Sequence, residues 1–287
     1  MYPDVPRDRL RVGADIVHVL FVIDEYTDRE SSAGVHEICD IILDALRNPD
    51  KPRPEGETSI GEMARQFWAR GRVLATAEAE KHLLEAFADY LDGTAQLAED
   101  RDKRAIRTID AYMEARRMDS GVRVCFSPNE LQLSIPDEAF YHPVVKELRD
   151  ASVDLVVLDN DVASYNREQA SCYEHWNILS VVMHQFHFDL YHATEWVAEY
   201  HKTVEARFLD ALTRLPSFNP KVDAALQVYV AGKLAASPSA NDSWKFESER
   251  YFGKNGAEVR KTKQVMDPEM KRESVRVLLF EDFVEAA

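Results

Sequence analysis

Hydrophobic residues recur with a helical period along most of the chain. In residues 36–48, Ile38, Ile42 and Leu46 fall on one face of a predicted helix, and residues 78–99 repeat the pattern. Apolar positions three to four residues apart form one buried stripe on a helix. Sustained strand-like alternation is scarce. The pattern therefore predicts an all-α fold.

Short breaks rich in proline and polar residues separate the predicted helices. One is the loop at 48–59, and Ser59 with Glu62 is typical of a capping box that starts the next helix. The chain has no repeat, low-complexity segment or domain linker, so residues 1–287 are predicted to form a single helical domain. The segment 253–287 is polar and poor in apolar residues, and we expect it to be mobile.

The apolar run at 14–23 follows several arginines and superficially imitates a signal peptide. Asp15 and His18 interrupt it, and no small-residue cleavage site follows. The run is also far shorter than the roughly 20 apolar residues of a membrane span. We interpret it as part of a core helix and expect no membrane span.

Charge and cysteine content narrow the classes of function. The formal net charge of −16 repels nucleic acid and anionic lipid surfaces, so we expect neither as a partner. Cys39, Cys125 and Cys172 are widely spaced and fit no metal-binding pattern, which is typical of reduced thiols in a cytoplasmic protein.

Three carboxylates stand close together directly after the apolar run, in the stretch DEYTD at 24–28. If residues 12–28 form one helix, Asp24 and Asp28 lie about 40° apart around its axis and about 6 Å apart along it. Two like charges so placed repel each other unless a cation lies between them. Taken alone, an acidic helix end exposed to water is the simpler interpretation. An EF-hand loop is excluded, because Arg29 stands where that loop needs glycine.

A second polar set changes this balance. Asn160, Ser164 and Glu168 directly follow a buried-looking run, and on a helix they span an arc of about 80°. An amide oxygen, a hydroxyl and a carboxylate on one side form half of a site for a hard divalent cation such as Mg²⁺. A plain polar helix face is the alternative interpretation.

Arginines in two other places supply positive charge. Arg116 and Arg117 stand near a predicted helix end, and Arg250 precedes Tyr251 late in the chain. Arginine binds oxygens in a bidentate manner, so metal-loaded carboxylates and arginines together would form a receptor for a diphosphate. Either arginine set alone would be interpreted as solvated.

Together these stretches resemble the motifs of the class I terpene synthases, from about residue 8 to about residue 252. The family's D(D/E)xxD motif is matched by Asp24, Glu25 and Asp28. Its NDxxSxxxE motif is matched by Asn160, Asp161, Ser164 and Glu168. Arg116 takes the place of the family's diphosphate sensor, followed by Asp119 and Ser120 as linker and effector, and Arg117 is the alternative. Arg250 and Tyr251 match a late Arg-Tyr pair. The residues in and around these motifs are most similar to those of sesquiterpene synthases of basidiomycete fungi.

The resemblance implies an α-helical barrel that binds farnesyl diphosphate with three Mg²⁺ ions. Asp24, in the motif that Asp28 completes, would hold two of these ions. The third ion would be bound by Asn160, Ser164 and Glu168.

The resemblance also implies the groups that bind and activate the substrate. Arg116, Arg250 and Tyr251 would act catalytically on the diphosphate, and Arg167 would contact it too. Phe21 and Trp244 match aromatic pocket residues of relatives, although ordinary core packing explains them equally well.

The implied reaction is ionisation and cyclisation of farnesyl diphosphate to a sesquiterpene hydrocarbon. The DExxD variant favours fungal enzymes of the humulyl route, with 1,11-closure to products such as protoilludene. We expect a monomer or homodimer.

One feature departs from the family pattern. In relatives the Asp-rich motif lies much deeper in the chain, so we expect this chain to lack the first N-terminal helices of the barrel. Two alternatives stay open: an inactive, non-catalytic helical relative, and a chain-elongating prenyltransferase. The second would carry another DDxxD motif where this chain has Asn160, Ser164 and Glu168.

Overall fold

The structure is a computed structural model that describes residues 5–28, 30–103, 105–171, 176–231 and 243–262. All regular elements in these ranges are helical, which confirms the all-α prediction. The helices are α1 (Arg7–Thr27), α2 (Ser32–Arg47), α3 (Ser59–Gly71), α4 (Ala77–Lys103), α5 (Ile109–Asp119), α6 (Ser127–Glu130), α7 (Asp137–Phe140), α8 (Pro143–Ser171), α9 (Ile178–Phe186), α10 (Leu190–Thr213), α11 (Pro220–Tyr229) and α13 (Gly256–Thr262).

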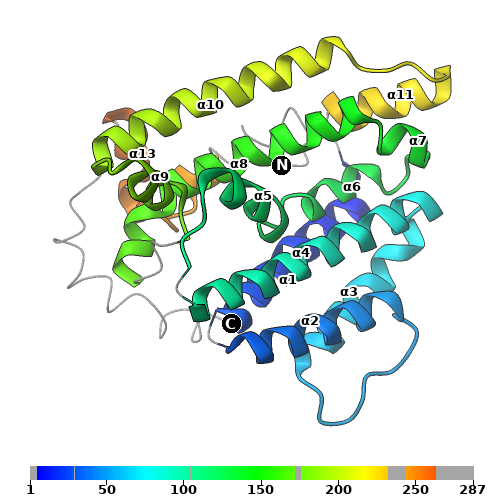
Figure 1. Cartoon of the computed structure of the whole chain (residues 1–287). Helices are drawn as coiled ribbons and strands as arrows, with labels where there is room; N and C mark the ends of the chain where they lie inside the picture. Colours follow the sequence, from blue (N-terminus) through cyan, green and yellow to red (C-terminus); the bar gives the residue numbers. More distant parts are fainter. Residues whose placement is uncertain (1–4, 29, 104, 172–175, 232–242, 263–287) are drawn as a thin grey trace.

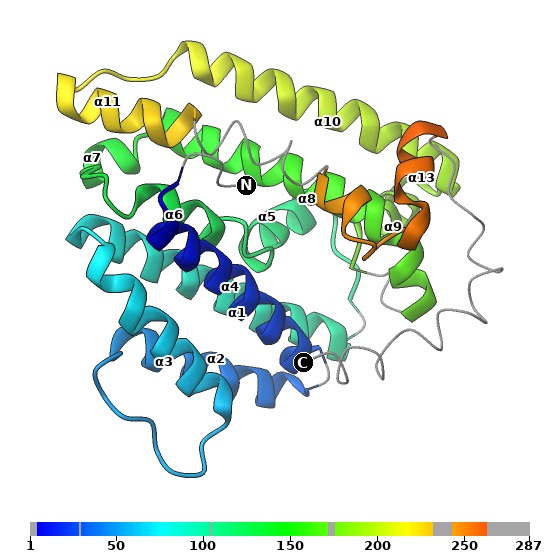
Figure 2. The ribbon, with the colours of Figure 1, turned by 180° about the vertical axis from the view of Figure 1, so that it is seen from behind.

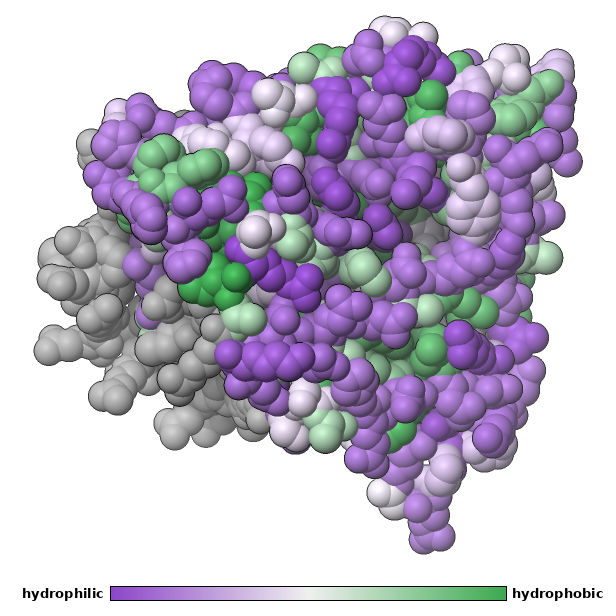
Figure 3. All heavy atoms as spheres, in the orientation of Figure 1, coloured by the Kyte–Doolittle hydropathy of each residue, from purple (hydrophilic) through white to green (hydrophobic). Residues whose placement is uncertain are grey.

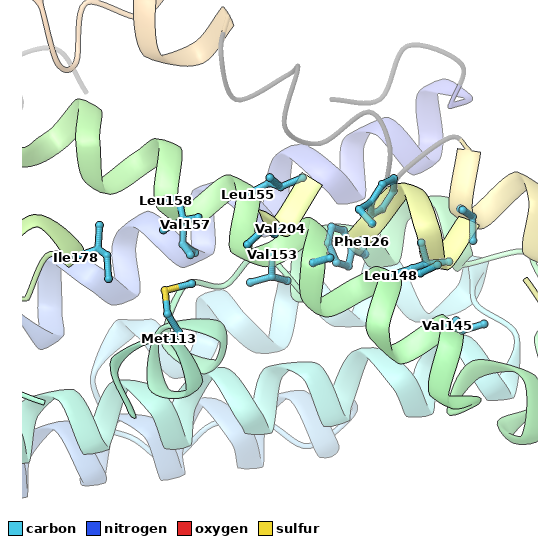
Figure 4. Close-up of a cluster of buried hydrophobic side chains, with 14 of the residues drawn as sticks. Met113, Phe126, Val145, Leu148, Val153, Leu155, Val157, Leu158, Ile178 and Val204 are labelled. Carbon is cyan, nitrogen blue, oxygen red and sulfur yellow. The ribbon is translucent and has the colours of Figure 1, made fainter. Parts of the chain in front are cut away.

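The helices form two groups, each with its own hydrophobic core. Helices α1 to α4 occupy one half of the molecule, and α8, α10 and α11 run along the other (Figures 1 and 2). Ile16, Trp68 and Leu83 are buried in the first core. The second core gathers side chains of α5, α8, α9 and α10, among them Met113 and Val157 (Figure 4).

Helix α5 contacts both groups, and one glycine fixes its distance from α4. A Cβ atom at Gly93 would lie 2.7 Å from the backbone nitrogen of Asp119 and 2.8 Å from Cβ of Met118. Only hydrogen fits at this position. The close approach brings the end of α5 against the middle of α4, near the acidic end of α1.

Helix boundaries differ in detail from the sequence-based expectations. Helix α3 does start at Ser59, but its N-cap residue is Thr58, which makes no side-chain capping bond. The predicted capping box is wrong, because the Glu62 carboxylate accepts hydrogen bonds from Arg65 and Gln66 instead. Cys39 is a buried free thiol and Cys125 a half-buried one, whereas Cys172 lies outside the described residues.

The end of the chain is described only in part. Residues 253–262 form a 3₁₀ turn, Gly253–Asn255, followed by α13. The rest of the segment that we expect to be mobile, 263–287, lies outside the described residues.

The outer surface is mainly polar. Figure 3 shows a face that is mostly hydrophilic with small hydrophobic patches, in keeping with the high charge of the chain. Across the described ranges, every helix is too short or too polar to cross a bilayer.

Candidate active site

The first group of predicted metal ligands lies at the C-terminal end of α1. The helix ends at Thr27, and Asp28 is its C-cap residue with helical backbone angles. The N–H group of Asp28 donates to the carbonyl oxygen of Asp24 at 2.9 Å. The two acidic residues are therefore one helical turn apart on the same side, as their spacing predicts.

Asp24 is accessible to water and yet closely surrounded by protein. Its side chain is exposed, but desolvation raises its pKa to about 6. A hydrogen bond from the Tyr90 hydroxyl, 2.7 Å from Asp24 Oδ1, opposes this rise in the pKa, and the charge of Asp28 adds to it. The carboxylate of Asp24 is therefore open to solvent on one side and held by the Tyr90 hydroxyl on the other.

The second group lies along one side of α8, in the helical arrangement that the sequence predicts. The Ser164 hydroxyl donates to Glu168 Oε1 at 2.5 Å, and Asn160 Nδ2 donates to the Tyr251 hydroxyl at 2.8 Å. Burial raises the pKa of Glu168 to about 7, and the negative charge of Asp161 contributes to the rise. Amide, hydroxyl and carboxylate oxygens thus lie together on this helix.

Arg116 connects α5 to this part of α8. Its Nη2 atom lies 3.2 Å from Asn160 Oδ1 and 3.1 Å from Asp161 Oδ1. Its Nη1 atom donates to Asp119 Oδ1 at 3.2 Å. Tyr112, one turn earlier on α5, also donates to the Asp161 carboxylate. The guanidinium therefore lies between two buried aspartates, Asp119 and Asp161, and also contacts Asn160.

Arg117, the alternative sensor, has different partners. Its Nε and Nη2 atoms donate to the two carboxylate oxygens of Asp154 at 2.6 and 2.9 Å. Asp154 is fully buried and also accepts from Arg207 on α10 at 2.5 Å. This network joins α5, α8 and α10, so the geometry favours Arg116 as the arginine that faces Asn160.

Residues late in the chain complete the site. Tyr251 is buried and bonds to Asn160. The guanidinium carbon of Arg250 lies 4.9 Å from the centroid of the Phe21 ring, and the Trp244 ring stacks on Phe21 at a centroid distance of 5.9 Å. The two aromatic residues singled out in the sequence thus meet each other and Arg250.

Contacts from the late segment link α1 to α8, because Arg250 lies over the Phe21 ring of α1 and the Tyr251 hydroxyl accepts from Asn160 of α8. Burial raises the pKa of Asp28, while the charges of Arg101, Arg167 and Arg250 oppose the rise. In turn, burial and the charge of Arg250 lower the pKa of Arg167. Two arginines thus crowd together beside an aspartate, and an anion bound between them would relieve their repulsion.

The donor set fits a hard divalent cation. Mg²⁺ prefers the oxygen ligands that Asp24, Asp28, Asn160, Ser164 and Glu168 provide. The raised pKa values of Asp24 and Glu168 indicate negative charge that a cation would stabilise. The described ranges contain no group of three or more His, Cys, Asp or Glu side chains placed to hold a metal ion. The candidate ligands do not form such a group, because they are divided between α1 and α8 and include an amide and a hydroxyl.

Several contributing residues were missed at the level of the sequence. Trp176 donates from Nε1 to Asp119 Oδ2 at 2.7 Å, and Tyr90 reaches Asp24 from α4. Neither stands in a recognisable pattern. Tyr112 could have been found, because it lies four residues before Arg116 and shares its helix face.

Comparison with known families gives a match over most of the chain. The profile described as "Terpene synthase family 2, C-terminal metal binding" matches residues 15–207. This range contains both candidate metal-binding sets and Arg116.

Two sequence relatives come from the fungus Postia placenta. Sesquiterpene synthase 14 is 49% identical over 285 residues, which span 97% of this chain and 81% of the relative. Delta(6)-protoilludene synthase 18 is 46% identical over 264 residues, which span 92% of this chain and 75% of the relative.

Solved structures share the fold at much lower sequence identity. The linalool/nerolidol synthase from Streptomyces clavuligerus, in complex with 2-fluorogeranyl diphosphate, aligns with a TM-score of 0.76 at 21% identity, covering 86% of this chain and 84% of that one. A variant of cucumene synthase aligns with a TM-score of 0.75 at 19% identity, covering 85% of this chain and 83% of that one.

Proposed function

Because the chain belongs to terpene synthase family 2, and so to the carbon–oxygen lyases that act on phosphates, we propose that it ionises farnesyl diphosphate and cyclises it to a sesquiterpene hydrocarbon. The names of its relatives support a fifteen-carbon substrate, since Sesquiterpene synthase 14 is 49% identical. Mg²⁺ is the proposed cofactor, because the candidate ligands are all oxygen atoms.

The convergence of Asp28, Arg167 and Arg250 carries this proposal. These residues come from the end of α1, from α8 and from the late segment at 243–252. Arg250 lies over Phe21 of α1, its neighbour Tyr251 bonds to Asn160 of α8, and the charges of Arg167 and Arg250 both act on Asp28. Carboxylates that can hold metal ions and arginines that can hold phosphate oxygens thus face one space. A diphosphate binds to such a combination of groups.

The first step of the proposed reaction breaks the allylic C–O bond, and the electron pair leaves with the diphosphate. Bound Mg²⁺ would supply Lewis-acid stabilisation of the charge that grows on this leaving group. Asp24 and Asp28 on one side, and Asn160, Ser164 and Glu168 on the other, would hold the ions. Arg116, Arg167, Arg250 and Tyr251 would bind and orient the diphosphate oxygens.

The carbocation that remains must be kept from water and from nucleophilic side chains until it has cyclised and lost a proton, which gives the neutral hydrocarbon. Phe21 and Trp244 form a stacked aromatic pair beside Arg250, close to the proposed diphosphate position. Aromatic faces attract a cation without offering it a nucleophile. These two rings, both exposed to solvent in the structure, are the proposed aromatic groups beside the site of ionisation.

The proposed mode of cyclisation is 1,11-closure along the humulyl route, to a protoilludene-like hydrocarbon. It is supported by Delta(6)-protoilludene synthase 18, which is 46% identical over 92% of this chain.

A product assay tests the proposal directly. Purified protein is incubated with farnesyl diphosphate and Mg²⁺, and the volatile products and the released diphosphate are measured. Asp24→Ala and Asn160→Ala variants, and a sample with a chelator, are the controls. We expect a cyclic hydrocarbon and an equal amount of diphosphate from the parent protein only.

The outcomes test the cyclisation route and the enzymatic activity separately. A cyclic product other than protoilludene would contradict the humulyl route alone. If the well-folded parent protein released neither hydrocarbon nor diphosphate, the enzymatic proposal for this chain would be wrong.

A further inference from the structure

Asn177 is a fully buried polar residue at the start of α9, outside every motif described above. It is the N-cap residue of this helix, and its Oδ1 atom accepts from the backbone N–H of Leu179 at 2.9 Å. Since the oxygen of the amide is used in this bond, the orientation of its NH₂ group is also fixed.

The NH₂ group of Asn177 points to α8. It donates to Glu168 Oε2 at 2.8 Å and to the carbonyl oxygen of Asp161 at 2.7 Å. The other carboxylate oxygen of Glu168 accepts from Ser164 at 2.5 Å. Glu168 is thus held by one donor inside its motif and by one donor from a different helix.

The neighbouring backbone strengthens this link. The N–H group of Ile178 donates to Asp161 Oδ2 at 3.1 Å. The start of α9 therefore binds both acidic side chains of the α8 motif, Glu168 through the Asn177 amide and Asp161 through the backbone N–H of Ile178. The donors and the acceptor of the Asn177 amide are all used. Buried polar networks in which every donor and acceptor is hydrogen-bonded are rigid.

We propose that Asn177 is a positioning residue that sets the orientation of the Glu168 carboxylate for metal binding. This inference rests on the proposed function, in which Glu168 is a ligand of Mg²⁺. Residues that hold metal ligands from outside typically change metal affinity by about 10- to 100-fold when they are replaced. Asn177 does so in addition to capping α9, and the test must separate the two roles.

Asn177→Asp separates them, because aspartate is as good an N-cap as asparagine. The variant keeps the acceptor for Leu179 but places a carboxylate where Glu168 now receives a hydrogen bond. Asn177→Ser is the second variant, since serine also caps but is too short to reach Glu168 and adds no charge. Asn219→Asp is the matched control, because Asn219 caps a different helix, α11, by accepting from Lys221 and Val222.

The measurement is the affinity for Mg²⁺ in the presence of inorganic diphosphate, by calorimetric titration well below the melting temperature. We expect the apparent affinity to fall about 10-fold in Asn177→Ser and about 100-fold in Asn177→Asp, and to stay unchanged in Asn219→Asp. A Glu168→Gln variant should show no further loss when Asn177→Ser is added, because the two residues act through the same carboxylate.

The result also distinguishes this inference from the proposed function. Equal Mg²⁺ affinity in the parent protein and both Asn177 variants would overturn the positioning role and leave the proposed function intact. Absence of Mg²⁺ and diphosphate binding to the parent protein would overturn the proposed function, and this inference with it.

Discussion

Tyr90 on α4 donates a hydrogen bond of 2.7 Å to Asp24 Oδ1, at the end of α1. Tyr90 is almost completely buried, so this bond links the core shared by α1 and α4 to the accessible carboxylate of Asp24. The bond stabilises the ionised form of Asp24 and opposes the rise in its pKa. A residue of another helix thus fixes the side chain of Asp24.

Tyr90→Phe should therefore weaken metal-dependent activity while preserving the fold. We expect kcat/KM at pH 7 to fall about tenfold, as for loss of a hydrogen bond to a charged group. The pKa of Asp24 should rise further, so the acidic limb of the pH–activity profile should move to higher pH. Tyr229→Phe, which removes another buried hydroxyl on α11, is the control and should leave this limb in place. Identical profiles for all three proteins would contradict the role given to Tyr90.

Two raised pKa values predict how metal binding depends on pH. Asp24, with a pKa of about 6, and Glu168, with a pKa of about 7, must lose their protons before they bind a cation. Thermal stabilisation by Mg²⁺ with inorganic diphosphate should thus be small at pH 5.5, grow through about pH 6–7, and level off above about pH 7.5. Melting temperatures across this range test the expectation, and a pH-independent stabilisation would contradict it.

In the metal-free protein the same groups act in the opposite direction. Their pKa values are higher in the folded than in the unfolded chain, so the folded chain binds more protons between about pH 4 and pH 7. Their contribution to stability therefore decreases as pH rises through this window. Asp24→Asn removes one of the two titrating groups. Its melting temperature in a chelator should exceed that of the parent by about 1–3 °C at pH 8, and the difference should vanish near pH 4.

The adjacent arginines of α5 should respond differently to replacement. Arg116→Lys cannot keep three bonds to Asp119, Asn160 and Asp161, so we expect a loss of about 10²-fold in kcat with little change in stability. Arg117→Ala leaves the buried Asp154 with one partner fewer, and should lower the free energy of unfolding by about 3 kcal/mol. Urea unfolding and steady-state kinetics separate the two effects. A larger kinetic effect at Arg117 would mean that Arg117, and not Arg116, is the diphosphate sensor.

Gly93 is predicted to be intolerant of even one methyl group. Gly93→Ala would place Cβ 2.7 Å from the backbone of Asp119, so α5 would have to move away from α4. We expect a loss of about 1–3 kcal/mol in the free energy of unfolding, together with reduced activity. At Gly34, also helical, a new Cβ would come closest to the flexible carboxylate of Glu30, at 2.9 Å. Gly34→Ala should therefore be neutral or stabilising, and equal losses at both sites would contradict the close-approach explanation.

The sequence alone predicted what depends on local periodicity. The apolar stripes gave the helical class, and the spacing of Asn160, Ser164 and Glu168 placed them on one side of a helix, as α8 shows. Spacing of this kind is a property of a single helix and needs no knowledge of its neighbours. The same holds for Asp24 and Asp28 on α1.

Contacts between helices could not be predicted in this way. Tyr90 lies far along the chain from Asp24 and looks like an ordinary core residue. Asn177 lies at the start of another helix from Glu168 and looks like an ordinary helix cap. The preference for Arg116 over Arg117 came from the family resemblance. Adjacent residues of a helix point about 100° apart, and only the position of α8 decides which of them reaches Asn160. The capping box at Ser59 failed for a local reason, because Glu62 bonds to Arg65 one turn further along the same helix and Thr58 is the N-cap residue.

The bond between Arg116 and Asn160 has a consequence for how the site takes up a cation. The Asn160 Oδ1 atom, the one ligand atom that this residue can offer to a metal, already accepts from the Arg116 guanidinium at 3.2 Å. An amide oxygen carries two lone pairs, so a cation bound to it would share the oxygen with a positive charge that is already in place. In the proposed site, the metal position would thus be bordered by a guanidinium before any anion arrives.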